Sequence, residues 1–173
     1  MGKKPFIYFN KLSKDHITLV VAYFIFTTII IFICISGSTD AAQIALIGYV
    51  VATQLAGYFF MYKALRDFTT YLICFGFAVL HILLYFLFKG NPNLEVVKGN
   101  ISSALLNSFA LLVLFQILRY FSLKIQKREF VVPSHGGGKD LFDNIEPSPT
   151  DYALFVIYFA SFGGLTYFAT MHG

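Results

Sequence analysis

The sequence predicts an all-α integral membrane protein with five transmembrane helices, and two observations lead to this class. Of the 173 residues, 57% are hydrophobic and 13% are charged, whereas soluble domains average roughly 45–50% and about 25%. The apolar residues also fall in five blocks of about twenty, the length of helix that crosses the hydrocarbon core of a bilayer. We therefore expect a membrane-embedded helical bundle rather than a soluble domain.

Short polar turns separate the blocks and predict how neighbouring spans pair. The expected spans are 16–36, 41–62, 69–88, 101–123 and 151–171. Ser36–Asp40 is a tight turn rich in helix breakers and N-cap residues, so the first two spans should form an antiparallel hairpin. Residues 89–100 join the third and fourth spans into a second hairpin, with Asn100 or Ser102 as the candidate N-cap. The fifth span then stands alone at the C-terminus.

These assignments divide the chain into four parts. They are a basic N-terminal segment (1–15), a four-span bundle (16–123), a loop containing glycine and proline (124–150), and the fifth span with the C-terminus (151–173). Thr150 or Asp151 is the candidate N-cap of the last span. Within the loop, Gly136–Gly138 predicts a flexible joint, and residues 141–146 form an acidic amphipathic segment that suits docking on a neighbouring protein.

The distribution of lysine and arginine predicts the orientation, because these residues are retained on the cytoplasmic side. Eleven of the 13 fall in residues 1–15, in the turn 63–67 or in residues 119–150, and only Lys89 and Lys98 lie on the opposite side. We therefore expect the N-terminus and the long loop to be cytoplasmic and the C-terminus to be outside, in the cytoplasmic (inner) membrane.

Few polar side chains lie inside the spans, where each needs a partner in protein or water. They are Gln54, His81, Asn107 and Gln116, and no Asp, Glu, Lys or Arg lies at mid-depth. Proton-coupled transporters usually carry a carboxylate there. His81 has three possible roles, namely a haem ligand, a proton relay or gate, and a neutral side chain hydrogen-bonded to the next helix. We favour the third, and an interhelical hydrogen-bonding role for Asn107 and Gln116.

Small residues recur at helical spacing on two spans. They are Ala41, Ala45, Gly48, Ala52 and Ala56 on the second span, and Ala153, Ala160 and Gly164 on the fifth. Small residues let two helix backbones approach closely, which favours association within lipid. We expect these faces to be packed, against either another span of the same chain or a different subunit.

Motifs that carry chemistry are missing from the sequence. It has no HExxH, no GxSxG, no Cys/His set with metal-ligand spacing and no paired carboxylates. His135–Lys139 resembles half of a phosphate-binding loop but lacks the leading glycine and the Ser or Thr after the lysine. Cys34 and Cys74 fall inside spans, where a small buried hydrophobe is the usual role. We expect no enzyme activity, no cofactor and no metal.

The expected partners are the lipid bilayer and other membrane subunits or copies of the chain. Nucleic acid is not expected, because the lysines and arginines lie at the ends of apolar blocks; the cluster Lys124–Arg128 should contact anionic lipid headgroups. The favoured hypothesis is a non-catalytic structural or assembly subunit of a larger complex, such as a secretion, motility or respiratory machine. The alternative is a small homo-oligomeric transporter or channel with a polar path from Gln54, His81 and Asn107. A haem-carrying membrane anchor is a third possibility.

Overall fold

The computed structural model describes residues 6–11, 14–96, 99–133 and 145–172, and this part of the chain contains five long helices. They are α1 (Lys14–Ser36), α2 (Thr39–Phe59), α3 (Phe68–Phe88), α4 (Leu106–Gln126) and α5 (Pro149–His172). Each is long and apolar enough to cross a membrane. The predicted five-helix membrane class is confirmed to that extent. The predicted joint at Gly136–Gly138 and most of the segment 141–146 lie outside the described residues.

Short elements connect the helices. The turn η1 (Ala64–Arg66) separates α2 from α3. Between α3 and α4 lie the turn η2 (Pro92–Leu94), the antiparallel strands β1 (Glu95–Val96) and β2 (Gly99–Asn100), and the turn η3 (Ile101–Leu105). The predicted fourth span therefore begins with a 3₁₀ turn, and the Asn100 side chain caps it by accepting from the Ser102 N–H at 2.9 Å.

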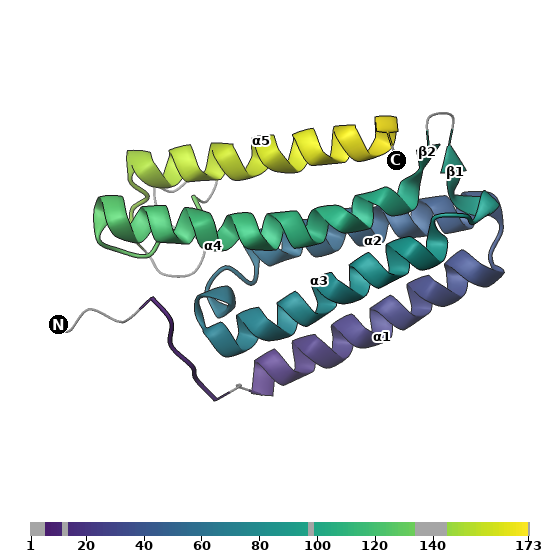
Figure 1. The fold of residues 1–173 in the computed structure, drawn as a ribbon. Coiled ribbons are helices and arrows are strands. Elements are labelled where there is room, and N and C mark those ends of the chain that lie inside the picture. The colour runs from purple at the N-terminus through teal and green to yellow at the C-terminus, as the bar shows by residue number, and fades with distance from the viewer. Residues whose placement is uncertain (1–5, 12–13, 97–98, 134–144, 173) are drawn as a thin grey trace.

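Helix α4 is the centre of the bundle (Figure 1). It packs against α2, α3 and α5, while α1 packs mainly against α2. Both predicted hairpins are present, because α1 pairs with α2 and α3 pairs with α4. In the first hairpin a side chain on Gly37 would place its Cβ 2.5 Å from the Ile33 carbonyl oxygen, so the turn requires glycine. Ser38 then caps α2 by accepting from the Ala41 N–H.

The start of α5 differs from the expected cap. The structure makes Ser148, rather than Thr150 or Asp151, the capping residue. Its hydroxyl accepts from the Asp151 N–H at 3.2 Å, and the Asp151 carboxylate accepts from the Ser148 N–H at 2.8 Å. This reciprocal pair is a capping box, and it satisfies two backbone donors that the helix itself leaves unpaired. Helix α5 therefore begins at Pro149, two residues before the predicted span.

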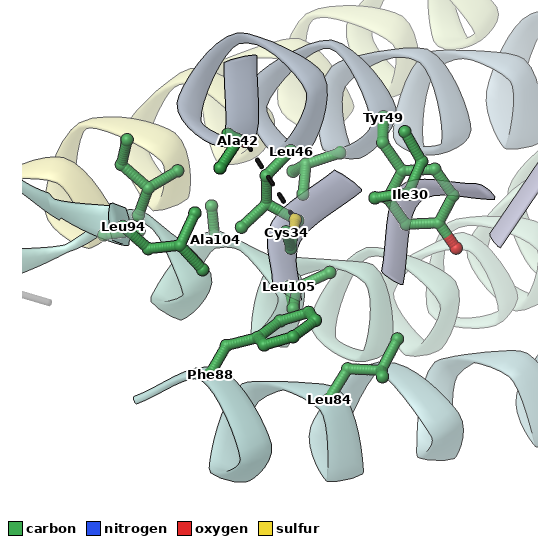
Figure 2. Close-up of a cluster of buried hydrophobic side chains, with 13 residues drawn as sticks. Ile30, Cys34, Ala42, Leu46, Tyr49, Leu84, Phe88, Leu94, Ala104 and Leu105 are labelled. Atoms are coloured by element: carbon green, nitrogen blue, oxygen red, sulfur yellow. Dashed lines mark hydrogen bonds between the residues drawn. The ribbon is translucent and has the colours of Figure 1, made fainter. Parts of the chain in front are cut away.

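The described core has two clusters of buried apolar side chains. One contains Leu46, Phe88 and Leu105 around the sulfur of Cys34, which lies 4.0 Å from the Ala42 carbonyl (Figure 2). Cys34 is thus the small buried hydrophobe expected from the sequence. The second cluster lies toward the other end of the bundle and is rich in aromatic rings: Tyr58, Tyr62, Phe115, Phe130 and Tyr158.

The bundle has two different ends (Figure 1). The N end carries residues 6–11, the α2–α3 turn, the end of α4 and the start of α5. The hairpin end carries the α1–α2 turn, the strands and the C-terminus. Between them, large apolar side chains such as Phe32, Ile44 and Phe86 are exposed on the outer surface. Exposed apolar surface of this extent suits contact with lipid rather than with water.

Candidate functional site

The polar groups inside the bundle centre on His81 of α3. Its Nε2 atom lies 2.7 Å from the hydroxyl of Tyr23 on α1 and 2.7 Å from the hydroxyl of Tyr49 on α2. The two hydroxyls are 3.2 Å apart, and Thr27 Oγ1 lies 2.8 Å from that of Tyr49. The cluster therefore ties three helices together through neutral hydrogen bonds, which is the kind of role expected for His81.

The surroundings of the imidazole favour one tautomer. The Nδ1 atom of His81 is buried and has no hydrogen-bond partner among the described residues. A proton on Nδ1 would be a buried donor without an acceptor, whereas a proton on Nε2 meets two hydroxyl oxygens. We therefore assign the neutral Nε2–H tautomer, in which Nδ1 keeps an unused lone pair.

The other predicted intramembrane amides do not join this cluster. The Gln54 amide nitrogen on α2 donates to the Ala104 carbonyl at 3.0 Å and lies 3.4 Å from the Ser108 hydroxyl. Asn107 is buried on α4, with its amide nitrogen unpartnered among the described residues. Gln116 lies toward the N end, where its amide nitrogen donates to the Leu65 carbonyl at 3.0 Å. Gln54 and Gln116 therefore join helices or turns at separate levels of the bundle, whereas the interhelical hydrogen bond expected of Asn107 is not found for its amide nitrogen among the described residues.

A small cavity of about 90 Å³ lies beside the His81 cluster. Side chains from all five long helices line it, most of them apolar, with Tyr23, Gln54, His81 and Ser108 among the polar ones. Sites for drug-sized ligands and cofactors have volumes of about 300–1,000 Å³. The cavity is therefore too small for a haem, and the described residues hold no group of three or more His, Cys, Asp or Glu that suits a metal ion.

The small residues of α2 and α5 mostly face outward. Ala41, Gly48, Ala52, Ala153, Ala160 and Gly164 are exposed, and Ala45 and Ala56 are half-buried. A Cβ added to Gly48 or Gly164 would meet no atom within 4 Å. Apart from Ala45, which packs against the core, these small residues are not buried between the described helices, so close packing within the chain is not seen at the exposed positions. Packing against another chain stays a prediction.

Among the described residues of the N end, two ion pairs with one fully buried partner each were not predicted from the sequence. Arg119 on α4 is 1% exposed and binds both carboxylate oxygens of Glu129 at 2.7–3.1 Å. Its guanidinium also lies over the ring of Phe6, 4.8 Å from the centroid. The sequence carried a signal for this contact, because Arg119 lies one helical turn after the buried Phe115 and so on the inward face of α4.

The second pair joins Arg128 to Asp151. The Asp151 carboxylate is fully buried and lies 2.6 Å from the Arg128 guanidinium. It also accepts from the Gln126 amide at 2.8 Å and from the Val131 N–H at 3.1 Å. One carboxylate therefore joins the end of α4, the following segment and the first turn of α5. The sequence predicts only a capping role for Asp151, whereas in the structure its carboxylate connects three elements.

Fold and site together place the protein among helical bundles with five helices capable of spanning a membrane, in which the side chains of His81, Gln54 and Gln116 form hydrogen bonds within the bundle. Comparisons with protein-family models, curated proteins and solved structures found no match to this chain. The functional argument therefore rests on the geometry.

The His81 cluster gives a first testable prediction. Replacing His81 by Leu removes the hydrogen-bond partner that the hydroxyls of Tyr23 and Tyr49 share. The hydrogen bond between these two hydroxyls and the one from Tyr49 to Thr27 remain. We expect the folded bundle to persist with the free energy of unfolding lowered by about 1–2 kcal/mol. Denaturation with sodium dodecyl sulfate in mixed micelles, followed by circular dichroism, measures this change. His81→Gln, which keeps a hydrogen-bonding group, should lose less. Equal stability of the Leu variant and the wild type would contradict the network.

Proposed function

We propose that the chain is a non-catalytic structural subunit of a larger complex in the cytoplasmic membrane, such as a secretion, motility or respiratory machine. The observation that carries the proposal is the outward direction of the small-residue faces on α2 and α5. A glycine within a helix lowers its stability by roughly 1 kcal/mol relative to alanine. The contacts of this bundle do not require Gly48 or Gly164, because their Cβ positions are open space. Close approach of a helix from another chain would explain why both positions are glycine.

The buried polar residues favour this proposal over a channel formed between copies. Gln54, His81 and Asn107 are 4%, 1% and 5% exposed inside a single chain. To line a path between several copies, they would have to face the surface at which the copies meet. Moving them there would break the hydrogen bonds of His81 and Gln54 described above. A subunit role requires no such rearrangement.

We further propose that the N end faces the cytoplasm. Among the described residues, Lys11, Lys63, Arg66, Lys124 and Arg128 lie at the N end, whereas Lys89 lies at the hairpin end. The helices thus bring together the three basic segments that the positive-inside rule places on one side.

The proposal predicts that one substitution prevents assembly of the complex without affecting the folding of the chain. Replacing Gly48 by Leu should leave the isolated chain at least as stable as the wild type, because the Cβ position is open space within the chain and leucine favours the helix more than glycine does. The same side chain should hold a neighbouring helix away and release the chain from its complex. Migration of the complex in native electrophoresis after extraction in mild detergent measures assembly. Gly164→Leu should likewise fold normally and fail to assemble.

Gly76 on α3 offers the matched control. It is exposed, and an added Cβ there also meets nothing within 4 Å, but it lies outside both small-residue faces. Gly76→Leu should keep the complex intact. If Gly48→Leu and Gly76→Leu leave the same amount of complex, the proposed packing face on α2 is refuted.

A further inference from the structure

A pocket of about 500 Å³ lies at the N end, between the segment 6–11 and the end of α4. Three cations line it, namely Arg66, Lys127 and Arg128, together with Tyr8 and Glu129. It is separate from the cavity beside His81 and from the small-residue faces, so neither the polar cluster nor the proposed assembly role accounts for it.

The charges of the lining leave positive potential in the pocket. The one lining carboxylate, that of Glu129, is bound through both oxygens by Arg119. Arg128 is paired with Asp151, but 34% of its side chain remains exposed. The Lys127 ammonium donates to the Lys124 carbonyl at 2.9 Å, and no carboxylate of the described residues forms an ion pair with it. An anion entering the pocket would therefore meet Lys127 and the exposed part of Arg128.

The backbone at Lys127 places these charges together. Lys127 ends α4 in the left-handed conformation, with φ 58°, which glycine or asparagine adopts more readily than lysine. This residue turns the chain, and the Ser122 hydroxyl fixes the turn by donating to the Arg128 carbonyl at 2.9 Å. Glycine would make the same turn at lower conformational cost, so the turn itself does not require a lysine. The lysine adds a hydrogen bond to the Lys124 carbonyl and an exposed positive charge.

The remaining lining fits an amphipathic ligand. Phe6 and Leu123 supply an apolar wall next to the cations. Burial raises the pKa of Tyr8, so its hydroxyl adds no negative charge to the lining. The pocket lies at the end of α4, and the ends of membrane-spanning helices are where lipid headgroups are expected. Lysine and arginine at this depth attract anionic lipids, and arginine can bind phosphate oxygens in pairs.

We propose that this pocket binds the phosphate headgroup of an anionic phospholipid, with Lys127 as the main charge contact and the start of the lipid chains against Phe6 and Leu123. The proposal narrows the general attraction expected of Lys124–Arg128 to one site. It predicts that the charge of Lys127 contributes to lipid binding. The charge of Lys124, which lies on α4 outside the pocket, should not contribute.

Native mass spectrometry of the full chain in detergent tests this proposal, with phosphatidylglycerol and phosphatidylcholine added in equal amounts. We expect bound phosphatidylglycerol to exceed phosphatidylcholine, and Lys127→Gln to lower phosphatidylglycerol binding roughly five-fold. Lys124→Gln removes the same charge and should change binding less than about two-fold. Circular dichroism checks that both variants keep the helical fold.

Three outcomes would overturn the proposal. Equal binding of the two lipids would remove the selectivity for an anion. Equal losses in Lys127→Gln and Lys124→Gln would show a general effect of charge instead of a site. Displacement of phosphatidylglycerol by millimolar inorganic phosphate would show that a free phosphate is the better ligand. None of these results depends on partner subunits, so the assembly proposal is tested separately.

Discussion

Replacing Glu129 by Gln is expected to lower the free energy of unfolding by about 3 kcal/mol. The change leaves the Arg119 guanidinium buried without a counter-charge, because Arg119 is 1% exposed and Glu129 is its ion-pair partner. A charge held away from water without a partner is among the most destabilising features in a protein. Denaturation with sodium dodecyl sulfate in mixed micelles, followed by circular dichroism, gives the free-energy difference.

Removing the other partner should have a smaller effect. Arg119→Met takes the charge out of the buried position and keeps most of the side-chain volume. Glu129, which is 26% exposed, can then bind water. Glu95→Gln, at an exposed site on the hairpin end, is the control and should change stability by less than about 0.5 kcal/mol. A Glu129→Gln variant as stable as this control would contradict the buried ion pair.

Replacing Asp151 by Asn should destabilise the chain by a similar amount, about 3 kcal/mol. The buried carboxylate accepts from Arg128, Gln126, Ser148 and the Val131 N–H. In Asn an NH₂ group replaces one of the two carboxylate oxygens. This group cannot accept a hydrogen bond, so it would lie against one or more of these donors. We therefore expect the segment after α4 to separate from α5. Limited digestion with trypsin, which cuts after Arg128, should then be faster than in the wild type.

Asp40 provides the matched control for this experiment. It is an exposed aspartate in the first turn of α2, so Asp40→Asn makes the same chemical change near another helix start. Its effect should be limited to a few tenths of a kcal/mol from the helix dipole. If Asp151→Asn is cut by trypsin at the wild-type rate and unfolds like Asp40→Asn, the network at the N end contributes little.

Most of the fold could be predicted from the sequence, because hydrophobic blocks of the length of a bilayer leave little choice of structure. The five spans and both hairpins follow from those blocks and from turns such as Ser36–Asp40. The strands β1 and β2 could not be predicted, since a strand of two residues is too short to show a periodic pattern. The capping box of Ser148 and Asp151 was missed because several capping residues stand next to one another there.

The candidate site was less predictable than the fold. The sequence identified His81 and the small residues, but spacing along a helix defines a face without saying where that face points. Gly48 therefore could not be assigned to the outer surface before the helices were placed. Likewise, Tyr23 and Tyr49 became partners of His81 only through the packing of α1 and α2, which brings together residues far apart in the chain.

Site-specific photocrosslinking in native membranes tests the proposed assembly role most directly. A photoreactive residue is placed at Gly48 on the small-residue face or at Leu83, which is exposed on α3. The account predicts that position 48 captures one particular membrane protein other than the chain itself, whereas position 83 captures only lipid. Capture of lipid alone at position 48, or the same products at both positions, would contradict it.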